Sequence, residues 1–198
     1  RITTVNNFAK KIFKYRSYTP IPFLILMLIF QKATIVSMIT GFVIVLIGEF
    51  FRLWGVSYAG SETRTTGDVG GTYLVISGPF AHVRNPLYFG NILIYTGIGV
   101  MSMALYPYLL IIAILFFIWQ YQTIIKEEET YLKNKFGKHY EDYYNSVPRW
   151  IPTFTKYKNP DIEQPPFNLK AGLKSERRTL QAISLTILLL IILYVVTN

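Results

Sequence analysis

The chain has 198 residues, of which 52% are hydrophobic and 16% are aromatic, and its mean hydropathy is positive. This composition is too apolar for an ordinary soluble domain and predicts an integral membrane protein. The formal net charge is +9, but a basic excess in loops beside apolar segments is explained by membrane orientation, so nucleic-acid binding is set aside. There is no cysteine and the two histidines lie far apart in sequence, so no metal site is predicted.

Residues 1–18 carry five Lys and Arg residues among apolar side chains. This arrangement fits a short basic amphipathic helix on an anionic leaflet, and it fits a solvated basic tail equally well. From residue 20 to residue 56 the sequence is almost continuously apolar and predicts two membrane spans, at about residues 18–30 and 34–56. The first is shorter than the roughly 20 residues that a perpendicular helix needs to cross a bilayer.

Glu49 is an ionisable residue inside the predicted second span, where a charge costs free energy unless it is paired or faces a cavity. Arg52 follows three residues later on the same side of the helix, so an internal ion pair is favoured over a direct ligand role. The polar loop at residues 57–77 contains four glycines, which permit close approach of a ligand to the backbone. It has no G-x-G-x-x-G or Walker pattern, so a phosphate loop of the soluble kind is not predicted.

The segment from Gly78 to Gly90 lies between this loop and the next apolar run. Arg84 supplies a planar guanidinium group that is always positively charged, and the Asn85 side chain supplies a hydrogen-bond donor and an acceptor. Pro86 fixes a backbone φ that favours the start of a helix. Such a combination suits a polar ligand at a helix N-terminus. The alternative is a positive-inside anchor at the mouth of a membrane span.

A third span is predicted at about residues 87–103 and a fourth at about residues 108–125, with a turn near Pro107 between them. Gly90, Gly97 and Gly99 place small residues on the third span, which favours close helix packing. No proline or glycine follows the fourth span before residue 137, so its helix is expected to continue beyond the membrane surface.

Two carboxylates on this helical extension have different predicted environments. Glu129 and Lys133 are four residues apart and are expected to form a surface ion pair. Glu128 shares a helical face with apolar residues, so its carboxylate is expected to face the bundle interior. The residues of that face are Phe117, Tyr121, Ile124, Leu132 and Phe136. An inward carboxylate just below a membrane span is a candidate for binding a cationic ligand group.

The predicted architecture is an all-α integral membrane protein, a bundle of about five transmembrane helices in one domain, residues 1–198, with a pocket on the cytosolic side. Residues 153–178 read as a surface connector, and a last span closes the chain at residues 179–198. With a cytosolic N-terminus, all of the twenty Lys and Arg residues except Lys32 fall on the cytosolic side. Arg84 and Glu128 then lie at the cytosolic ends of neighbouring antiparallel spans and can face one pocket.

Several short motifs occur in the order and spacing of a known enzyme family. They are Gly78-Pro79-Phe80, Arg84-Asn85-Pro86-Leu87-Tyr88-Phe89-Gly90, Glu128-Glu129 with Leu132, Phe136-Gly137 with Tyr140, and Val147 with Arg149 and Pro152. Over about residues 50–152 the chain resembles the isoprenylcysteine carboxyl methyltransferase family and the related phospholipid N-methyltransferases. These are small integral membrane enzymes that use S-adenosylmethionine. The connector and the last span lie outside the resemblance.

The resemblance implies S-adenosylmethionine as methyl donor, S-adenosylhomocysteine as product, and a donor site on the cytosolic side. The pair Glu128 and Glu129 would include the carboxylate that binds the donor's amino group, and the helical-face argument also selects Glu128. The rest of the donor would contact Gly78, Pro79, His82, Val83, Arg84, Asn85, Pro86 and Tyr88. Arg149 would lie near the reacting group.

One departure from the family pattern concerns the proton chemistry. Asn85 occupies the position that is His in the isoprenylcysteine enzymes, and Asn cannot titrate, so a base role does not transfer to it. A carboxylate or thiolate acceptor needs no base, whereas an amine must first lose a proton. For an amine acceptor the candidate bases are Glu49, His82 or a tyrosine, although His82 also reads as a plain interfacial residue.

We therefore predict a multi-pass membrane methyltransferase that transfers a methyl group to a lipophilic acceptor from the bilayer. That acceptor is an isoprenylcysteine-like carboxylate or a lipid amine or thiol, and the oligomeric state is left open. Two other functions are considered: an NADPH-dependent membrane reductase of the sterol-reductase type, for which the chain looks short, and a non-catalytic membrane lipid-binding or scaffold protein. In the scaffold, Arg84 and the acidic residues 127–129 would be boundary charges only.

Overall fold

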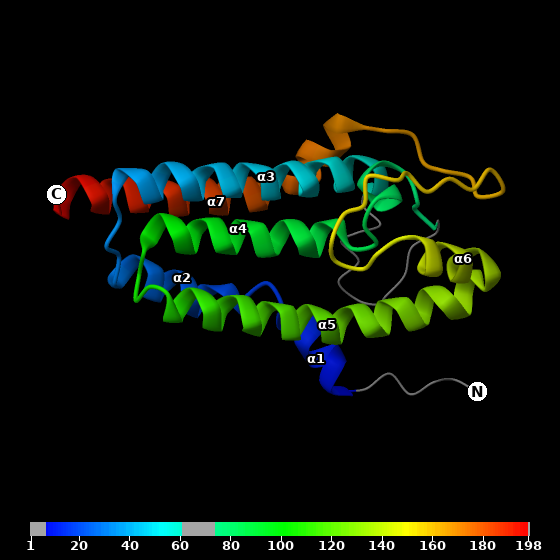
Figure 1. The fold of residues 1–198 in the computed structure, drawn as a ribbon, viewed down its shortest axis with the longest axis horizontal. Helices are drawn as coiled ribbons and strands as arrows, with labels where there is room; N and C mark the ends of the chain where they lie inside the picture. The colour runs from blue at the N-terminus through cyan, green and yellow to red at the C-terminus, as the bar shows by residue number, and fades with distance from the viewer. Residues whose placement is uncertain (1–6, 61–73, 198) are drawn as a thin grey trace.

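The computed structural model describes residues 7–60 and 74–197 (Figure 1). These residues form helices and connecting segments without a strand, which confirms the predicted all-α class. The helices are α1 (Asn7–Tyr15), α2 (Pro20–Ile29), α3 (Ile35–Ala59), the short 3-10 helix η2 (Gly78–Ala81), α4 (Pro86–Ser102), α5 (Tyr108–Phe136), α6 (Lys138–Ser146) and α7 (Leu169–Thr197). Three glycines of the predicted polar loop, Gly67, Gly70 and Gly71, lie outside the described residues.

The long helices run along the long axis of the molecule, while η2, α6 and the segment 147–168 gather at one end (Figure 1). Helices α3, α5 and α7 are each long and apolar enough to cross a membrane. Helix α2 has 10 residues and α4 has 17, fewer than the roughly 20 of a perpendicular span. Three candidate spans are therefore present, and the number of five stays a prediction.

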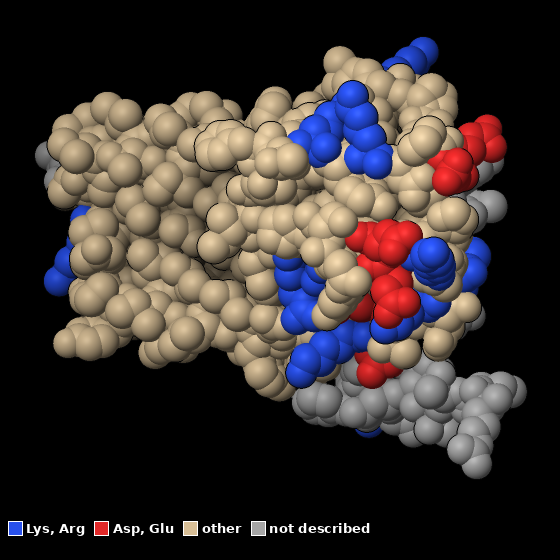
Figure 2. Space-filling model, turned by 45° about the vertical axis from the view of Figure 1, so that its right-hand side comes forward, with Lys and Arg blue, Asp and Glu red and all other residues tan. Residues whose placement is uncertain are grey.

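Charged side chains are concentrated over one end of the face drawn in Figure 2, and most of the remaining surface is uncharged. Many large apolar side chains on the long helices are exposed, for example Ile35 at 59% and Leu115 at 61%. Such a surface is unfavourable in water and is expected where lipid replaces water around the helices. The distribution is that of a membrane protein with one polar end.

Helices α3 and α4 pack backbone to backbone through glycines. A Cβ atom on Gly97 would lie 2.6 Å from the Gly41 carbonyl oxygen, and one on Gly90 would lie 2.6 Å from the Gly48 carbonyl oxygen. Only glycine permits this approach, because any side chain would collide with the facing backbone. The predicted packing role of Gly90 and Gly97 is confirmed, and it aligns the polar ends of the two helices.

Helix α5 is continuous from Tyr108 to Phe136, which confirms the predicted extension beyond the fourth span. It ends at Gly137, whose positive φ of 53° suits glycine and turns the chain into α6. Helix α4 begins at Pro86, in agreement with the predicted helix start. Arg84 and Glu128 are thereby brought to the same end of the bundle.

Helix α7 begins at Leu169, well before the predicted last span, so the second part of the predicted connector is helical. The Asn168 side chain accepts from the Ala171 amide at 2.9 Å, and the Asn168 amide donates to the Ser57 carbonyl at 2.8 Å. These bonds start the helix and attach it to the end of α3. The Lys and Arg residues of this region therefore lie on a helix that packs against the bundle.

The contact between α3 and α4 yields a test of packing. Gly97→Ala is expected to lower the free energy of unfolding by about 1–3 kcal/mol, because the added methyl group meets the backbone of α3. Gly99→Ala on the same helix is the control, since its methyl group meets the terminal Cδ1 of Leu110, a side-chain end that can move. Thermal unfolding in detergent micelles compares the two, and equal stability would contradict the packing account.

Candidate active site

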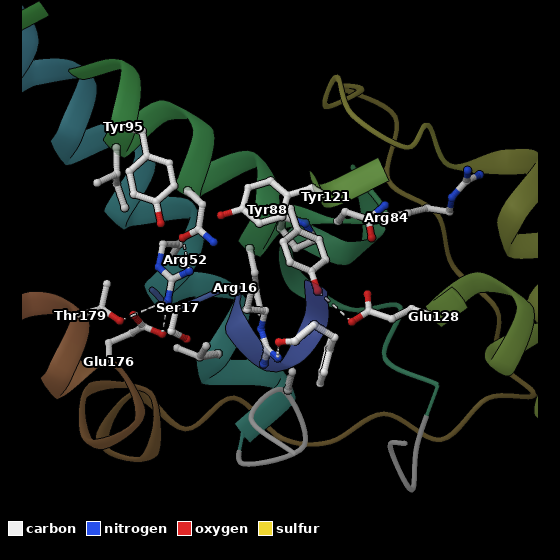
Figure 3. Close-up of a pocket in the computed structure, with 18 of the residues that line it drawn as sticks. Arg16, Ser17, Arg52, Arg84, Tyr88, Tyr95, Tyr121, Glu128, Glu176 and Thr179 are labelled. Atoms are coloured by element: carbon white, nitrogen blue, oxygen red, sulfur yellow. Dashed lines mark hydrogen bonds and ion pairs between the residues drawn. The ribbon is translucent and has the colours of Figure 1, made fainter. Parts of the chain in front are cut away.

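A cavity of about 900 Å³ lies at the polar end of the bundle. Its walls come from the junction of α1 and α2, from α3, α4, α5 and α6, and from α7. In the view of Figure 3, Tyr88, Tyr121 and Glu128 lie on one side and Arg52, Glu176 and Thr179 on the other. Segments far apart in the sequence therefore share one cavity.

Glu128 projects into this cavity, as its helical face predicts. The Tyr88 hydroxyl donates to Glu128 Oε1 at 2.8 Å, and the Tyr88 ring stacks on Tyr121 with centroids 4.7 Å apart. Among the described residues Tyr88 is the hydrogen-bond donor to Glu128, which leaves the carboxylate with further acceptor capacity toward the cavity. This arrangement can hold a cationic group against an aromatic wall.

Glu129 is the centre of a second polar cluster. Its Oε1 accepts from Arg149 Nε at 3.0 Å and from Arg84 Nη2 at 3.1 Å, and its Oε2 accepts from Arg149 Nη2 at 2.6 Å. The predicted surface pair between Glu129 and Lys133 is wrong. Lys133 pairs with Glu141 at 3.3 Å instead, because the fold brings two arginines from distant segments to Glu129 and supplies stronger, bidentate bonds.

Arg84 joins this cluster to the segment that follows α6. It donates to the carbonyls of Tyr144 and Val147, and its guanidinium lies over the Tyr144 ring at 4.0 Å. Its amide also donates to the Pro148 carbonyl at 2.9 Å. Arg84 therefore anchors the segment after α6 to the start of α4, which is more than a boundary charge does.

The segment before α4 is held in place by its backbone. Gly78 has a positive φ of 59°, and a Cβ there would collide with the Tyr58 ring. His82 Nδ1 donates to the Thr153 carbonyl at 2.8 Å, and the Val83 side chain is fully buried. The Asn85 side chain donates from Nδ2 to the Arg149 carbonyl at 3.3 Å. These contacts orient Arg84 and Pro86 toward the cavity.

Six of the ten predicted cofactor-binding residues line the cavity: Arg84, Asn85, Pro86, Tyr88, Glu128 and Glu129. The other four, Gly78, Pro79, His82 and Val83, lie behind it in η2 and the following turn. The two predicted catalytic residues, Arg149 and Glu49, are also absent from the cavity wall.

Arg149 is committed to structural bonds. Besides the bonds to Glu129, its Nη1 donates to Gln122 Oε1 at 3.1 Å. The hydrogen bonds that Arg149 donates to the Glu129 carboxylate raise the pKa of Arg149, so the guanidinium stays charged. Burial likewise raises the pKa of Tyr143, whose neutral hydroxyl donates to the Phe80 carbonyl at 2.8 Å.

Glu49 lies behind the opposite wall, next to Arg52, which lines that wall together with Glu176. Its Oε2 lies 3.8 Å from Arg52 Nε, which agrees with the favoured internal pair. Arg52 Nη2 donates to both oxygens of Glu176, at 2.9 and 2.7 Å, and Arg52 Nη1 donates to Asn91 Oδ1 at 2.5 Å. Glu176 is fully buried. Sequence reasoning missed Glu176, although it is the one acidic residue after position 163 and lies four residues before Leu180, at the start of the predicted last span.

Comparison with known proteins assigns a family. The model of the phospholipid methyltransferase family matches residues 36–139, more than half of the chain, so the chain belongs to this family. The matched segment holds α3, η2, α4 and α5, and with them Arg84, Tyr88 and Glu128. Helices α1, α2 and α7 lie outside it.

One curated relative is the cobalt-zinc-cadmium resistance protein CzcN of Cupriavidus metallidurans. It is 29% identical over 107 residues, which cover 54% of this chain and 45% of the relative. The chain thus spans less than half the length of that protein. No solved structure matches the chain significantly.

The Glu129 cluster can be tested by removing its centre. Glu129→Ala leaves the largely buried Arg84 and the partly exposed Arg149 without their shared carboxylate, and it is expected to lower the free energy of unfolding by about 2–4 kcal/mol. Glu141→Ala is the control, because its pair with Lys133 is more than half exposed on both sides and contributes about 0–1 kcal/mol. Thermal unfolding reports both, and similar losses would show that the cluster has no structural role.

Proposed function

We propose that the protein is an S-adenosylmethionine-dependent methyltransferase that acts on a lipophilic acceptor from the bilayer. The observation that supports this most strongly is the Glu128 carboxylate. It lies in the family-matched segment, accepts from Tyr88 and faces a cavity of about 900 Å³, within the usual size of small-molecule sites. The membrane helices around the cavity are consistent with a lipid acceptor.

The residues present fit this donor. In the proposal Glu128 binds its amino group, while Arg84, Asn85 and Pro86 with Tyr88 contact the rest of the molecule. The backbone behind the cavity holds these residues in position, and it is formed by Gly78, Pro79, His82 and Val83. The Glu129 carboxylate keeps the Arg84 side chain in place. When bound, S-adenosylmethionine supplies a methyl group that leaves its positively charged sulfur as the acceptor attacks, giving S-adenosylhomocysteine.

The protein's contribution to such a transfer is alignment, exclusion of water and fixed charge. Tyr88, Tyr95 and Tyr121 form an aromatic wall that can orient both ligands and keep water out. Arg149 would act as a positioning residue through Glu129, and Glu49 would act on an amine acceptor only through its contact with Arg52. A catalytic role for either residue stays a prediction.

Binding of the reaction product tests the donor site. Calorimetric titration with S-adenosylhomocysteine is expected to show about tenfold weaker binding, or more, for Glu128→Gln, because a charged hydrogen-bond partner of the amino group is lost. Glu127→Gln is the matched control, since its side chain does not line the cavity. Unchanged affinity of Glu128→Gln would contradict the assignment, and NADPH is included as a ligand expected not to bind.

The acceptor class can be tested in membranes. Membranes that contain the protein, incubated with donor labelled in the methyl group, are expected to incorporate label into the lipid fraction. Membranes with the Glu128→Gln variant should incorporate at least about tenfold less. Label that appears only in protein or in small water-soluble thiols would contradict a lipid acceptor.

A further inference from the structure

Arg16 and Glu128 carry opposite charges and line the same cavity. Arg16 follows directly after α1, outside the family-matched segment, whereas Glu128 lies within that segment on α5. No direct ion pair joins these two described residues, yet the charge of Arg16 acts on the Glu128 carboxylate through space. Two unlike charges that face one cavity without contact can each bind one end of a ligand that carries both charges.

The other arginines of the cavity wall are placed differently. Arg52 and Arg84 pair with carboxylates of the protein at 2.7 and 3.1 Å, and both pairs are largely buried, so their charges are compensated. Arg178 is exposed and belongs to α7. The cation whose charge acts most strongly on Glu128 is Arg16. Arg16 is therefore the cation available to the anionic end of a ligand held by Glu128.

The position of Arg16 is fixed by local bonds at the end of α1. The Thr19 hydroxyl donates to the Arg16 carbonyl at 3.0 Å, and Arg16 Nη1 donates to the Phe13 carbonyl at 2.8 Å. The guanidinium also stacks over the Phe13 ring, 3.7 Å from its centroid. Among the described residues, no carboxylate forms an ion pair with Arg16. Its Nε and Nη2 atoms can therefore donate to a ligand, in the planar geometry that matches a carboxylate.

Helix α1 is attached to the bundle on the side of α5. The two helices contact each other, and Ile12 and Phe13 pack against the hydrophobic core of the bundle. In the view of Figure 3, Arg16 and Glu128 lie on either side of the Tyr88 hydroxyl. The fold thus brings a cation from the first described helix to the part of the cavity that holds the inward carboxylate.

An α-amino acid group carries the two charges that this arrangement can bind. Its ammonium and its carboxylate are attached to the same carbon atom, so the carboxylate can extend toward Arg16 while the ammonium binds Glu128. The amino acid end of S-adenosylmethionine is such a group. Both Glu128 and Glu129 line the cavity and would repel its carboxylate. The donor's carboxylate therefore requires a cation close to Glu128.

We propose that Arg16 binds the carboxylate of the methyl donor's amino acid group, opposite Glu128, which binds the ammonium of the same group. The inference rests on the proposed methyltransferase function and adds a donor-binding residue from outside the family-matched segment. Ser17, which also lines the cavity, places a hydroxyl group next to Arg16. The end of α1 then forms one wall of the donor site.

A ligand without the carboxylate tests this assignment on the unchanged protein. The full chain in detergent micelles is titrated calorimetrically with S-adenosylhomocysteine and with its analogue in which hydrogen replaces the carboxylate. The wild type is expected to bind the analogue about tenfold more weakly, or more, because the charged contact with Arg16 is lost. Equal affinity for the two ligands would overturn the proposal, and this result does not depend on the folding of any variant.

Variants at the end of α1 test the residue itself. Arg16→Gln is expected to weaken binding of S-adenosylhomocysteine about tenfold or more, and to bind the analogue no more weakly than the wild type does. Arg16→Lys keeps the charge and is expected to restore part of the affinity. The matched control is Lys14→Gln, which removes the same charge from an exposed neighbour that does not line the cavity. It is expected to bind both ligands as the wild type does.

The pattern of losses decides whether the carboxylate is the group that Arg16 binds. If Arg16→Gln weakened binding of both ligands equally, Arg16 would act on the site as a whole and the proposal would be wrong. A loss in Lys14→Gln as large as that in Arg16→Gln would show a general effect of charge at this end of the protein, which also contradicts it.

Glu128→Gln in the same titrations separates this inference from the proposed function. The variant is expected to weaken binding of both ligands, since both carry the ammonium group. Binding of S-adenosylhomocysteine that depends on Glu128 but not on Arg16 would support the donor site and contradict the inference alone. A wild-type protein that binds neither ligand would contradict the methyltransferase function, and the inference with it.

Discussion

The close backbone contact between α3 and α4 is the constraint on which the polar end depends. Gly48 and Gly90 let the two helices approach until a Cβ would meet a facing carbonyl. The Arg52 side chain crosses Gly90 at the same point, since a Cβ on Gly90 would lie 2.6 Å from Arg52 Cγ. It thereby reaches Asn91 on α4 and Glu176 on α7. A larger residue at this crossing would separate the helices and displace both polar walls of the cavity.

Two kinds of charge are present around the cavity. In two ion pairs the opposite charges compensate each other, and each pair joins segments that are distant in sequence. These pairs are Arg52 with Glu176 and Arg84 with Glu129. Burying these charges is tolerable only because they are paired and hydrogen-bonded, and the pairs in turn hold the segments in one arrangement. Glu128 differs, because its carboxylate lines the cavity and accepts from the Tyr88 hydroxyl rather than from an arginine.

Much of the fold follows from local patterns in the sequence. Hydropathy predicted the apolar helices, the absence of Pro and Gly after residue 107 predicted the long α5, and Pro86 predicted the start of α4. The helical period alone placed Glu128 on the inward face, and the structure shows it bonded to Tyr88. The same reasoning failed at Glu129. Its predicted partner was Lys133, four residues away, but Glu129 binds Arg84 and Arg149, which only the tertiary fold brings near.

The sequence by itself determined the all-α class, the membrane character, most helix bounds and the inward carboxylate, since each depends on interactions within a few helical turns. Only the tertiary structure decided which charges compensate each other, where α7 begins, and that this helix forms part of the cavity wall. The pair of Arg52 and Glu176 joins residues 124 positions apart. No local pattern predicts such a pair, because it forms only after helix packing has excluded water and brought the two side chains together.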